Sequence, residues 1–487
     1  MIYNRIKFPL IFLCLIGIVF GLNVNSATNV TKDGQTKFSG TLIGYKGLLA
    51  VPIMRSEFMP KPIMGVGISS DGKVYVTETI RQQREEISLI QSPFLHEKDM
   101  ELISTKAKRG WIIENYSSQI AAHQGVGDYN GDGKVDVRDL SVRSEKIYTL
   151  QDENADGVFD KATLFADGFN NVLTGVAHSV TPIDGHVYST IIPDLWKLTD
   201  TNGDGVADRR ESIANGFAPH IGYGNHDLHS IVQGYDGKIY WSMGDRGLDV
   251  LTKKGKRVSN PHSGCILRCN PDGSEFEIFA NGLRNCQYFD FDNYGNIFAV
   301  DHDADFQGER ERLVYLPEGS DSGWRMYYQY RNTTLVKAAR DDLYNPWIGE
   351  KMWLPFHGGQ PSHLLPAIEN SWNAPAAFSF QPGTALAGSY KDHFLLGGMG
   401  NIRAFKMIAD GAGFKRHGNH ILIQGLGAQV LTSAFGPDGR LYFTLWRPSR
   451  GMSQLWTLQA NKNTQKMIEV KDVLAKDQKK QNIDELF

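Results

Sequence analysis

The stretch that decides the fold runs from Gly224 to Gly247 and reads Gly-Asn-His-Asp-Leu-His-Ser-Ile-Val-Gln-Gly-Tyr-Asp-Gly-Lys-Ile-Tyr-Trp-Ser-Met-Gly-Asp-Arg-Gly. Residues 231–232 and 238–243 are rich in β-branched and aromatic side chains, which favour strands. The segment Gly234-Tyr-Asp-Gly237 between them has the composition of a tight turn. The stretch therefore predicts a β-hairpin.

Three side chains capable of acid–base chemistry flank this hairpin. His226 and His229 stand at the start of its first strand, and Asp245 follows its second strand. Antiparallel pairing brings the end of the second strand back to the start of the first. We therefore expect Asp245 to reach an imidazole and to fix its tautomer, as a general base requires. The alternative is a pair of solvent-facing histidines beside an aspartate that only caps turn amides.

The same turn followed by an alternating strand recurs along the chain. The copies are Asp71-Gly-Lys-Val-Tyr-Val, Asp184-Gly-His-Val-Tyr, Asp236-Gly-Lys-Ile-Tyr-Trp, Tyr294-Gly-Asn-Ile-Phe-Ala and Asp438-Gly-Arg-Leu-Tyr-Phe, with a degenerate sixth at Tyr390-Lys-Asp-His-Phe-Leu-Leu. One such unit is expected per blade of a β-propeller. We predict an all-β protein, a six-bladed β-propeller with long loop insertions. A β-sandwich, which also uses Asp-Gly turns, is the alternative.

Two insertions separate these units. Residues 82–144 are polar and favour helix around 97–106, which suggests a cap over one face of the propeller. Residues 330–374 are rich in aromatic residues and histidine, including Trp347, Trp353 and Trp372. An aromatic rim suits a carbohydrate ligand, whereas buried packing of the same indoles is the alternative.

Three acidic loops have the ligand order of an EF-hand. Oxygen-bearing side chains alternate around a central glycine, and the seventh position contributes a main-chain carbonyl, which is the ligand set that Ca²⁺ prefers. Surface turns without an ion are the alternative. The predicted ligands are Asp128, Asn130, Asp132, Lys134, Asp136 and Asp139 in the first loop, Asp152, Asn154, Asp156, Val158 and Asp160 in the second, and Asp200, Asn202, Asp204, Val206, Asp208 and Glu211 in the third.

The N-terminal residues predict export. Basic residues precede an apolar run from Phe8 to Leu22 and a small-residue end at Ala27, which is the order of a signal peptide. We expect residues 1–27 to be a signal peptide, 28–458 the propeller and 459–487 a polar tail. The protein would then be periplasmic or extracellular, with membrane association if the N-terminal segment is retained.

Composition excludes some classes of protein. A hydrophobic content of 41% with 22% charged residues is that of a folded globular protein rather than a disordered one. A net charge of −3 with mixed signs argues against a nucleic-acid partner.

Three cysteines follow the predicted cleavage point. Cys265 and Cys269 lie on one face of an expected strand, where four residues separate them by roughly 13 Å, too far for a disulfide. The chain therefore has either one bridge that includes Cys286 or a reduced, buried trio.

Together, the repeats, His226, Asp245 and the segment Gly282-Leu-Arg-Asn-Cys-Gln287 resemble the glucose/sorbosone dehydrogenase family of quinoprotein propellers over residues 224–329. The resemblance implies that His226 is the general base, that Asp245 orients it, and that Arg284, Asn285 and Gln287 hold pyrroloquinoline quinone. Arg284 would also polarise the quinone. The segment 301–305 resembles the loop that helps hold the cofactor calcium. Large exported propellers of this superfamily with Asp-rich calcium loops are more similar still.

The chain departs from this family in two respects. It has no Cys-x-x-Cys-His motif, so it carries no c-type haem and its electron acceptor would be another protein. The late-blade cations that clamp the cofactor carboxylates have no clear counterpart, because residues 397–405 contain only Arg403 and residues 422–437 contain no cation. A polyanionic cofactor needs such charge.

Three functions compete on these grounds. The first is a dehydrogenase that oxidises a small-molecule sugar or another alcohol or aldehyde. The second is a metal-dependent lyase or hydrolase whose ion is held in the channel by His226, His229 and His302 with acids such as Asp301 and Asp303. The third is a calcium-stabilised, non-catalytic propeller that binds carbohydrate or protein.

Overall fold

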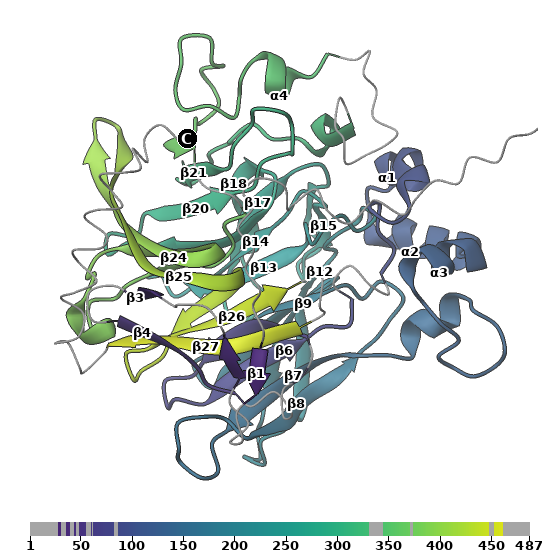
Figure 1. Cartoon of the computed structure of the whole chain (residues 1–487). Coiled ribbons are helices and arrows are strands. Elements are labelled where there is room, and N and C mark those ends of the chain that lie inside the picture. Colours follow the sequence, from purple (N-terminus) through teal and green to yellow (C-terminus); the bar gives the residue numbers. More distant parts are fainter. Residues whose placement is uncertain are drawn as a thin grey trace, which may run out of the picture. The chain divides into compact units, whose positions relative to one another are not determined.

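A computed structural model describes most of the chain (Figure 1). The described residues are 28–30, 36–38, 43–44, 48–54, 60, 62–81, 86–330, 344–370, 374–447 and 452–460. The predicted signal peptide and nearly all of the predicted tail lie outside them. Two compact units are separated at residue 41. The first contains a two-stranded ladder, β1 (Thr28–Val30) with β2 (Thr36–Phe38), and the second contains everything else.

The second unit is built from antiparallel sheets, which confirms the all-β class. Four sheets have four strands each. They comprise β5 (Ile63–Ile68), β6 (Val74–Glu78), β7 (Glu145–Gln151) and β8 (Lys161–Phe169); β9 (Ala177–Ile183), β10 (His186–Ile191), β11 (Asp194–Thr199) and β12 (Arg209–Asn215); β13 (Leu228–Gln233), β14 (Ile239–Met243), β17 (Gly264–Cys269) and β18 (Glu277–Leu283); and β19 (Cys286–Phe291), β20 (Ile297–Asp301), β21 (Arg312–Tyr315) and β22 (Glu369–Asn370). A separate hairpin joins β15 (Leu248–Leu251) to β16 (Arg257–Asn260).

The fifth sheet has seven strands. They are β23 (Phe378–Phe380), β24 (Phe394–Asp410), β25 (Gly413–Phe435), β26 (Leu441–Arg447), β27 (Met452–Ala460), β4 (Leu48–Pro52) and β3 (Ile43–Gly44). The early strand β4 pairs with the last strand β27, with Trp456 opposite Pro52. An N-terminal segment therefore completes the sheet at the C-terminal end of the fold.

The prediction of six blades is corrected, because the described residues form five such sheets rather than six. The long strand β25 is the reason. Its first half pairs with β24 and β3, with Ile423 opposite both Ile402 and Gly44. Its second half pairs with β26, with Ser433 opposite Phe443. Continuous pairing through β25 thus joins the two last repeat units into one sheet.

The sheets follow one another around a closed circuit, which is the arrangement of a propeller. The first strand of each sheet contacts that of the next, from β5 to β9, β13, β19 and β23, and β25 contacts β5 again. Four of the five recurrent turns join the first and second strands of a four-stranded sheet, as the hairpin from β13 to β14 illustrates, and the fifth, at Asp438, joins β25 to β26. In each turn the glycine has a positive φ, for example 76° at Gly237, which a residue without Cβ adopts at no steric cost.

The hydrophobic core lies between neighbouring sheets. Central strands are buried on both faces; every residue of β14 is buried, for example. Trp241 of β14 packs edge-on against Phe217, which follows β12. Because both faces of a blade meet another blade, these strands read as apolar runs rather than strict alternations.

Helices occupy the insertion between β6 and β7. They are η1 (Pro93–Leu95), α1 (His96–Glu101), α2 (Thr105–Asn115), α3 (Ser118–Gln124) and η2 (Val137–Ser141), and α1 to α3 lie together in Figure 1. The remaining helical segments are η3 (Met326–Tyr330), α4 (Pro346–Gly349) and η4 (Leu386–Gly388). Ile112 and Ile120 of the insertion pack in one core cluster with Tyr223 and Met326. No helix among the described residues has the length and apolar run needed to cross a membrane.

Candidate active site

The predicted hairpin places His226 against Asp245. Strands β13 and β14 pair antiparallel with Leu228 opposite Met243, so the residues just outside them meet. His226 Nδ1 lies 2.9 Å from Asp245 Oδ1, and both side chains are buried. Gly244 permits this approach, because a Cβ there would lie 2.4 Å from the carbonyl oxygen of His226. The expected dyad therefore exists in the fold.

Asp245 is held by two further partners. Trp324 Nε1 donates to Oδ2 over 2.9 Å, and Arg246 Nη2 donates to Oδ1 over 3.1 Å. Burial alone would raise the pKa of Asp245, but Arg246 and His226 outweigh burial and hold that pKa below its ordinary value. Asp245 is therefore ionised and accepts the Nδ1–H of His226, which leaves the Nε2 lone pair as the basic atom.

Arg246 links this dyad to the helical insertion. Its Nη1 donates over 3.1 Å to Asp99 Oδ2 of α1, a residue 147 positions earlier in the chain. Asp99 also accepts hydrogen bonds from Tyr330 and from the main-chain N–H of Ile221. Arg246 and Asp99 are completely buried. The chain thus runs from α1 through Asp99, Arg246 and Asp245 to His226.

The environment keeps His226 neutral. Burial lowers the pKa of His226 to about 3, and the nearby Arg284 acts in the same direction. Asp245 opposes both but does not outweigh them. A neutral imidazole at physiological pH can accept a proton. No described residue is hydrogen-bonded to Nε2 of His226.

Arg284 lies beside the dyad, so the three predicted catalytic residues come together. Its carbonyl oxygen accepts the main-chain N–H of Asp245 over 2.8 Å. Its guanidinium is bound by the protein: Nε donates to Gln329 Oε1 over 2.9 Å, Nη1 to the carbonyl of Asp303, and Nη2 to Asp305 over 3.4 Å. All three guanidinium nitrogens of Arg284 therefore have protein partners.

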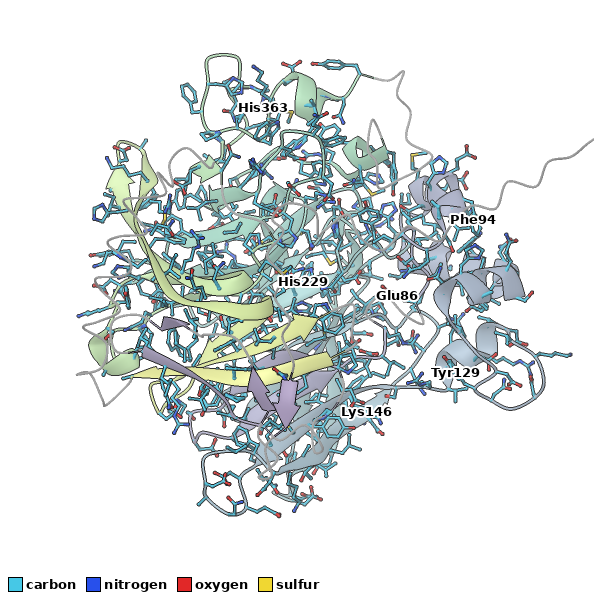
Figure 2. All side chains as sticks on the ribbon, in the orientation of Figure 1. Glu86, Phe94, Tyr129, Lys146, His229 and His363 are labelled. Atoms are coloured by element: carbon cyan, nitrogen blue, oxygen red, sulfur yellow. The ribbon has the colours of Figure 1, made fainter. Side chains whose placement is uncertain are left out.

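Asn285 and Gln287 differ in whether their side-chain amide atoms have hydrogen-bond partners. Asn285 Oδ1 lies 2.9 Å from His229 Nε2, and its Nδ2 lies 3.4 Å from His302 Nδ1, so both ends of the amide have a partner. Gln287 Oε1 is buried without a partner among the described residues. His229, labelled in Figure 2, belongs to β13 and contacts His178 of β9 with ring centroids 4.4 Å apart. Nε2 of His229 is therefore occupied by Asn285, whereas its Nδ1 is buried without a partner among the described residues.

The acidic segment after β20 mainly binds main-chain amides. Asp301 accepts from the N–H groups of Arg284 and Asn285. Glu309 accepts from the N–H of Ala304 over 2.8 Å, and burial raises the pKa of Glu309 to about 7. In the part of the chain that the structure describes, no group of three or more His, Cys, Asp and Glu side chains could hold a metal ion. The channel ligands proposed for a metal-dependent lyase therefore do not converge.

Sequence reasoning missed two polar residues that flank His226. The ring of Tyr223 contacts that of His226 edge-on with centroids 5.1 Å apart, and its hydroxyl is buried without a partner in the described part of the chain. Asn225, at a φ of 65°, has both amide atoms buried and likewise unpartnered there. A loop tyrosine and asparagine carry no spacing signal. The only hint in the sequence is the residue type at position 225, because asparagine tolerates a positive φ better than most residues do.

The three predicted calcium loops share one geometry. In each loop, the first carboxylate accepts the N–H of the sixth-position glycine over 2.8 Å, as Asp128 does from Gly133. The third-position Asn accepts the N–H of the fifth residue over 2.9 Å in all three. The side-chain and main-chain oxygens are hard donors that suit calcium.

The loops differ at their later positions. In the first loop, Asp132 and Asp136 each lie 2.6 Å from the guanidinium of Arg138, and Asp139 caps the N–H of Tyr129 over 2.8 Å. In the third loop, the expected twelfth ligand Glu211 instead binds Lys253 over 2.6 Å. Glu211 lies within β12, where strand pairing sets its direction.

Other sequence predictions concern packing and thiols. Trp347 is 1% exposed and donates to Glu309, so this indole belongs to the core and not to a ligand rim. Trp372 lies outside the described residues. Cys265, Cys269 and Cys286 are free and buried, which is the reduced trio that the spacing allowed.

Several solved structures are similar to this chain. An oxidoreductase from Thermus thermophilus, described as a glucose dehydrogenase, has 14% identity and a TM-score of 0.47, over 85% of this chain and 100% of its own. The PQQ-bound aldose sugar dehydrogenase of Streptomyces coelicolor has 12% identity and a TM-score of 0.46, over 89% and 99%. A carbohydrate-active enzyme of family AA12 from Trichoderma reesei has 11% identity and a TM-score of 0.48, over 91% and 100%.

Comparison by sequence gives one family. No curated protein matches the chain. One family, described as a domain of unknown function (DUF7133), matches residues 71–446. The match includes three of the five sheets in full, the helical insertion, the three acidic loops and the dyad. Because this match covers more than half of its length, the chain belongs to the DUF7133 family.

Proposed function

We propose that the protein is an exported oxidoreductase that acts on the CH–OH group of a sugar or of another alcohol or aldehyde, with His226 as the general base. The observation that carries this proposal is the buried dyad, in which His226 Nδ1 lies 2.9 Å from Asp245 and Nε2 has no partner among the described residues. The unpartnered hydroxyl of Tyr223 and amide of Asn225 beside it are groups that substrate hydroxyls would bind.

The dyad performs the proton transfer. The substrate hydroxyl gives its proton to Nε2 of His226, and the carboxylate of Asp245 stabilises the imidazolium that results. Asp245 keeps this role because Trp324 and Arg246 fix its two oxygens. Arg284, 4% exposed, adds a positive charge beside the site.

Pyrroloquinoline quinone is the acceptor that the family resemblance implies, but the residues that the structure describes do not fit it. The cofactor is a polyanion and needs cations. Arg284 is instead surrounded by acids, with Asp305, Asp245 and Asp303 acting on its charge. Arg403 of β24 donates its Nε to Asn401 over 3.2 Å. We therefore propose a separate electron-acceptor protein, which would receive two electrons and the hydrogen of the substrate C–H bond while His226 takes the hydroxyl proton.

The proposal is tested with purified protein, a panel of sugars and alcohols, and an artificial two-electron dye acceptor. Substrate-dependent dye reduction that needs no added quinone is the expected result. Absence of dye reduction with every substrate, with and without pyrroloquinoline quinone and calcium, would remove the oxidoreductase proposal and leave a binding propeller.

The activity should tolerate acid better than an ordinary histidine base would allow. Because burial lowers the pKa of His226 to about 3, its imidazole stays unprotonated well below the usual value of about 6.5. We expect kcat/KM, which reports the free enzyme, not to fall through protonation of histidine between pH 7 and about 5. A limb centred near pH 6.5 would mean that His226 is more exposed to water than the structure has it.

Calcium is proposed for the acidic loops, where it would be structural. Bound cations would relieve the repulsion among the carboxylates of each loop and stabilise the native state. Excess chelator should therefore lower the melting temperature, and Asp204→Ala should reduce that response. Asp249→Ala, in an acid outside the loops, is the control. An unchanged melting curve in chelator would contradict this proposal.

A further inference from the structure

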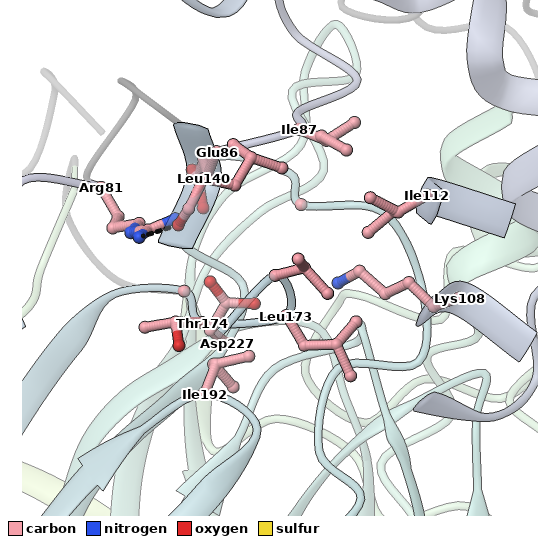
Figure 3. Close-up of a pocket in the computed structure, with 13 residues that line it drawn as sticks. Arg81, Glu86, Ile87, Lys108, Ile112, Leu140, Leu173, Thr174, Ile192 and Asp227 are labelled. Carbon is pink, nitrogen blue, oxygen red and sulfur yellow. Dashed lines mark hydrogen bonds between the residues drawn. The ribbon is translucent and has the colours of Figure 1, made fainter. Parts of the chain in front are cut away.

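A cavity of about 30 Å³ lies beneath α2, separate from the His226 dyad (Figure 3). Its wall comes from α2, from the segment that follows β6, from η2 before β7, from the loops before β9 and β13, and from Ile192 between β10 and β11. Since a water molecule needs roughly 10–15 Å³ by such a measure, the cavity has room for about two or three non-hydrogen atoms. His226 does not line it.

Lys108 supplies the nucleophilic group of this cavity. It lies one helical turn before Ile112, on the buried face of α2, and is 8% exposed. Its Nζ donates to the carbonyl of Ala218 over 3.0 Å and has no other hydrogen-bond partner among the described residues. In Figure 3 the amine points into the cavity, between Ile112 and Leu173.

Asp227 lies across the cavity from Lys108. It is 3% exposed, and its carboxyl group makes no hydrogen bond to a described residue. Each of the two groups acts on the charge of the other, yet no ion pair within 4.0 Å joins these two described residues. The separation leaves space for a small guest in contact with both.

Burial opposes the charged form of each group. Burial lowers the pKa of Lys108, against the opposing charges of Asp227 and Glu86. Burial raises the pKa of Asp227, against Lys108. A desolvated, neutral lysine is the form that attacks carbonyl carbon, and a protonated carboxyl group can donate to the carbonyl oxygen.

We propose that this cavity is a second reactive site, in which Lys108 forms an imine with a one- or two-carbon aldehyde. The Nζ lone pair forms the C–N bond, the carbonyl π pair moves to oxygen, and Asp227 donates a proton to that oxygen. The nitrogen then returns a proton to Asp227, and Asp227 passes that proton to the hydroxyl, which leaves as water as the nitrogen lone pair forms the C=N bond. Asp227 finally takes the remaining N–H proton, and the imine remains. The volume excludes larger aldehydes. The negative charge of Glu86, which acts on Lys108, disfavours anionic ones. The proposal is independent of the oxidoreductase activity.

Reductive trapping of the folded wild-type protein tests this. Acetaldehyde with cyanoborohydride at pH 7, followed by peptide mass spectrometry, should place the ethyl group on Lys108 before it appears on Lys106, which is exposed on the same helix. Because burial lowers the pKa of Lys108, a larger fraction of this amine is neutral than in an ordinary lysine, so labelling of Lys108 should be the faster of the two. Benzaldehyde should not label Lys108.

Two variants provide controls. Lys108→Arg should remove the fast labelling while keeping an N–H donor for the carbonyl of Ala218, and Lys106→Arg should leave the fast labelling intact. The comparison of the two lysines within wild-type protein needs neither variant to fold. Labelling that follows surface exposure, with Lys108 unmodified, would overturn the proposal and show that Lys108 only tethers α2 to the propeller.

Discussion

Replacing His226 by alanine is expected to lower kcat/KM by about 10² to 10⁴, the usual contribution of a positioned general base. The side chain is buried and its Nδ1 is held by Asp245 at 2.9 Å, so no solvent group can readily take over proton transfer. Asp245→Asn should cost less, because the imidazole remains but loses the charge that stabilises its protonated form. Dye reduction with the best substrate of the panel measures both effects.

His123→Ala is the matched control, because this histidine is exposed on α3 and contacts Gln119 and Phe94, away from the dyad. It should leave kcat/KM near the wild-type value. A His226→Ala protein that keeps full activity would exclude general-base catalysis by the dyad. The unpartnered groups of Tyr223 and Asn225 would then have to be explained as a binding site without chemistry.

Replacing Arg246 by methionine should cost about 3 to 5 kcal/mol of unfolding free energy, because it leaves two buried carboxylates without their shared cation. Arg246 lies 3.1 Å from both Asp99 and Asp245, and none of the three side chains is exposed. The loss should appear in urea unfolding. Activity should fall as well, since the orientation of Asp245 depends on the same guanidinium.

Arg257→Met provides the comparison for this variant. Arg257 also binds an aspartate, Asp249, over 2.6 Å, but 61% of its side chain is exposed. An exposed pair contributes little because water solvates both charges when it breaks, so this variant should unfold near the wild-type urea concentration. Equal effects of the two substitutions would mean that Arg246 is solvated in the native protein.

Local sequence was sufficient for the elements built from neighbouring residues. The turn at Gly237 and the apolar runs beside it predicted the hairpin. The hairpin in turn predicted the contact of His226 with Asp245, because antiparallel pairing determines which residues of the two strands lie opposite each other. The main-chain geometry of the acidic loops followed for the same reason, since each carboxylate binds amides within five positions of itself.

Contacts between distant residues could not be obtained in this way. Whether two repeat units form separate sheets depends on how far β25 continues its pairing, and its residues are equally suited to either outcome. The amide of Asn285 could serve a ligand or neighbouring histidines, and only the packing of β13 and β19 decides for His229 and His302. Motif spacing does not record these partners.

By itself, the sequence determined the all-β class, the repeated turns and the His226–Asp245 dyad, because these depend on backbone preferences and hydrogen bonds over short stretches of chain. The tertiary structure alone decided that Asp99 of the helical insertion supports Arg246 across 147 residues, and that Lys108 and Asp227 face one cavity. A buried ionisable side chain is either paired with an opposite charge or held in its neutral form. Which of the two occurs depends on the neighbours that the whole fold packs around it.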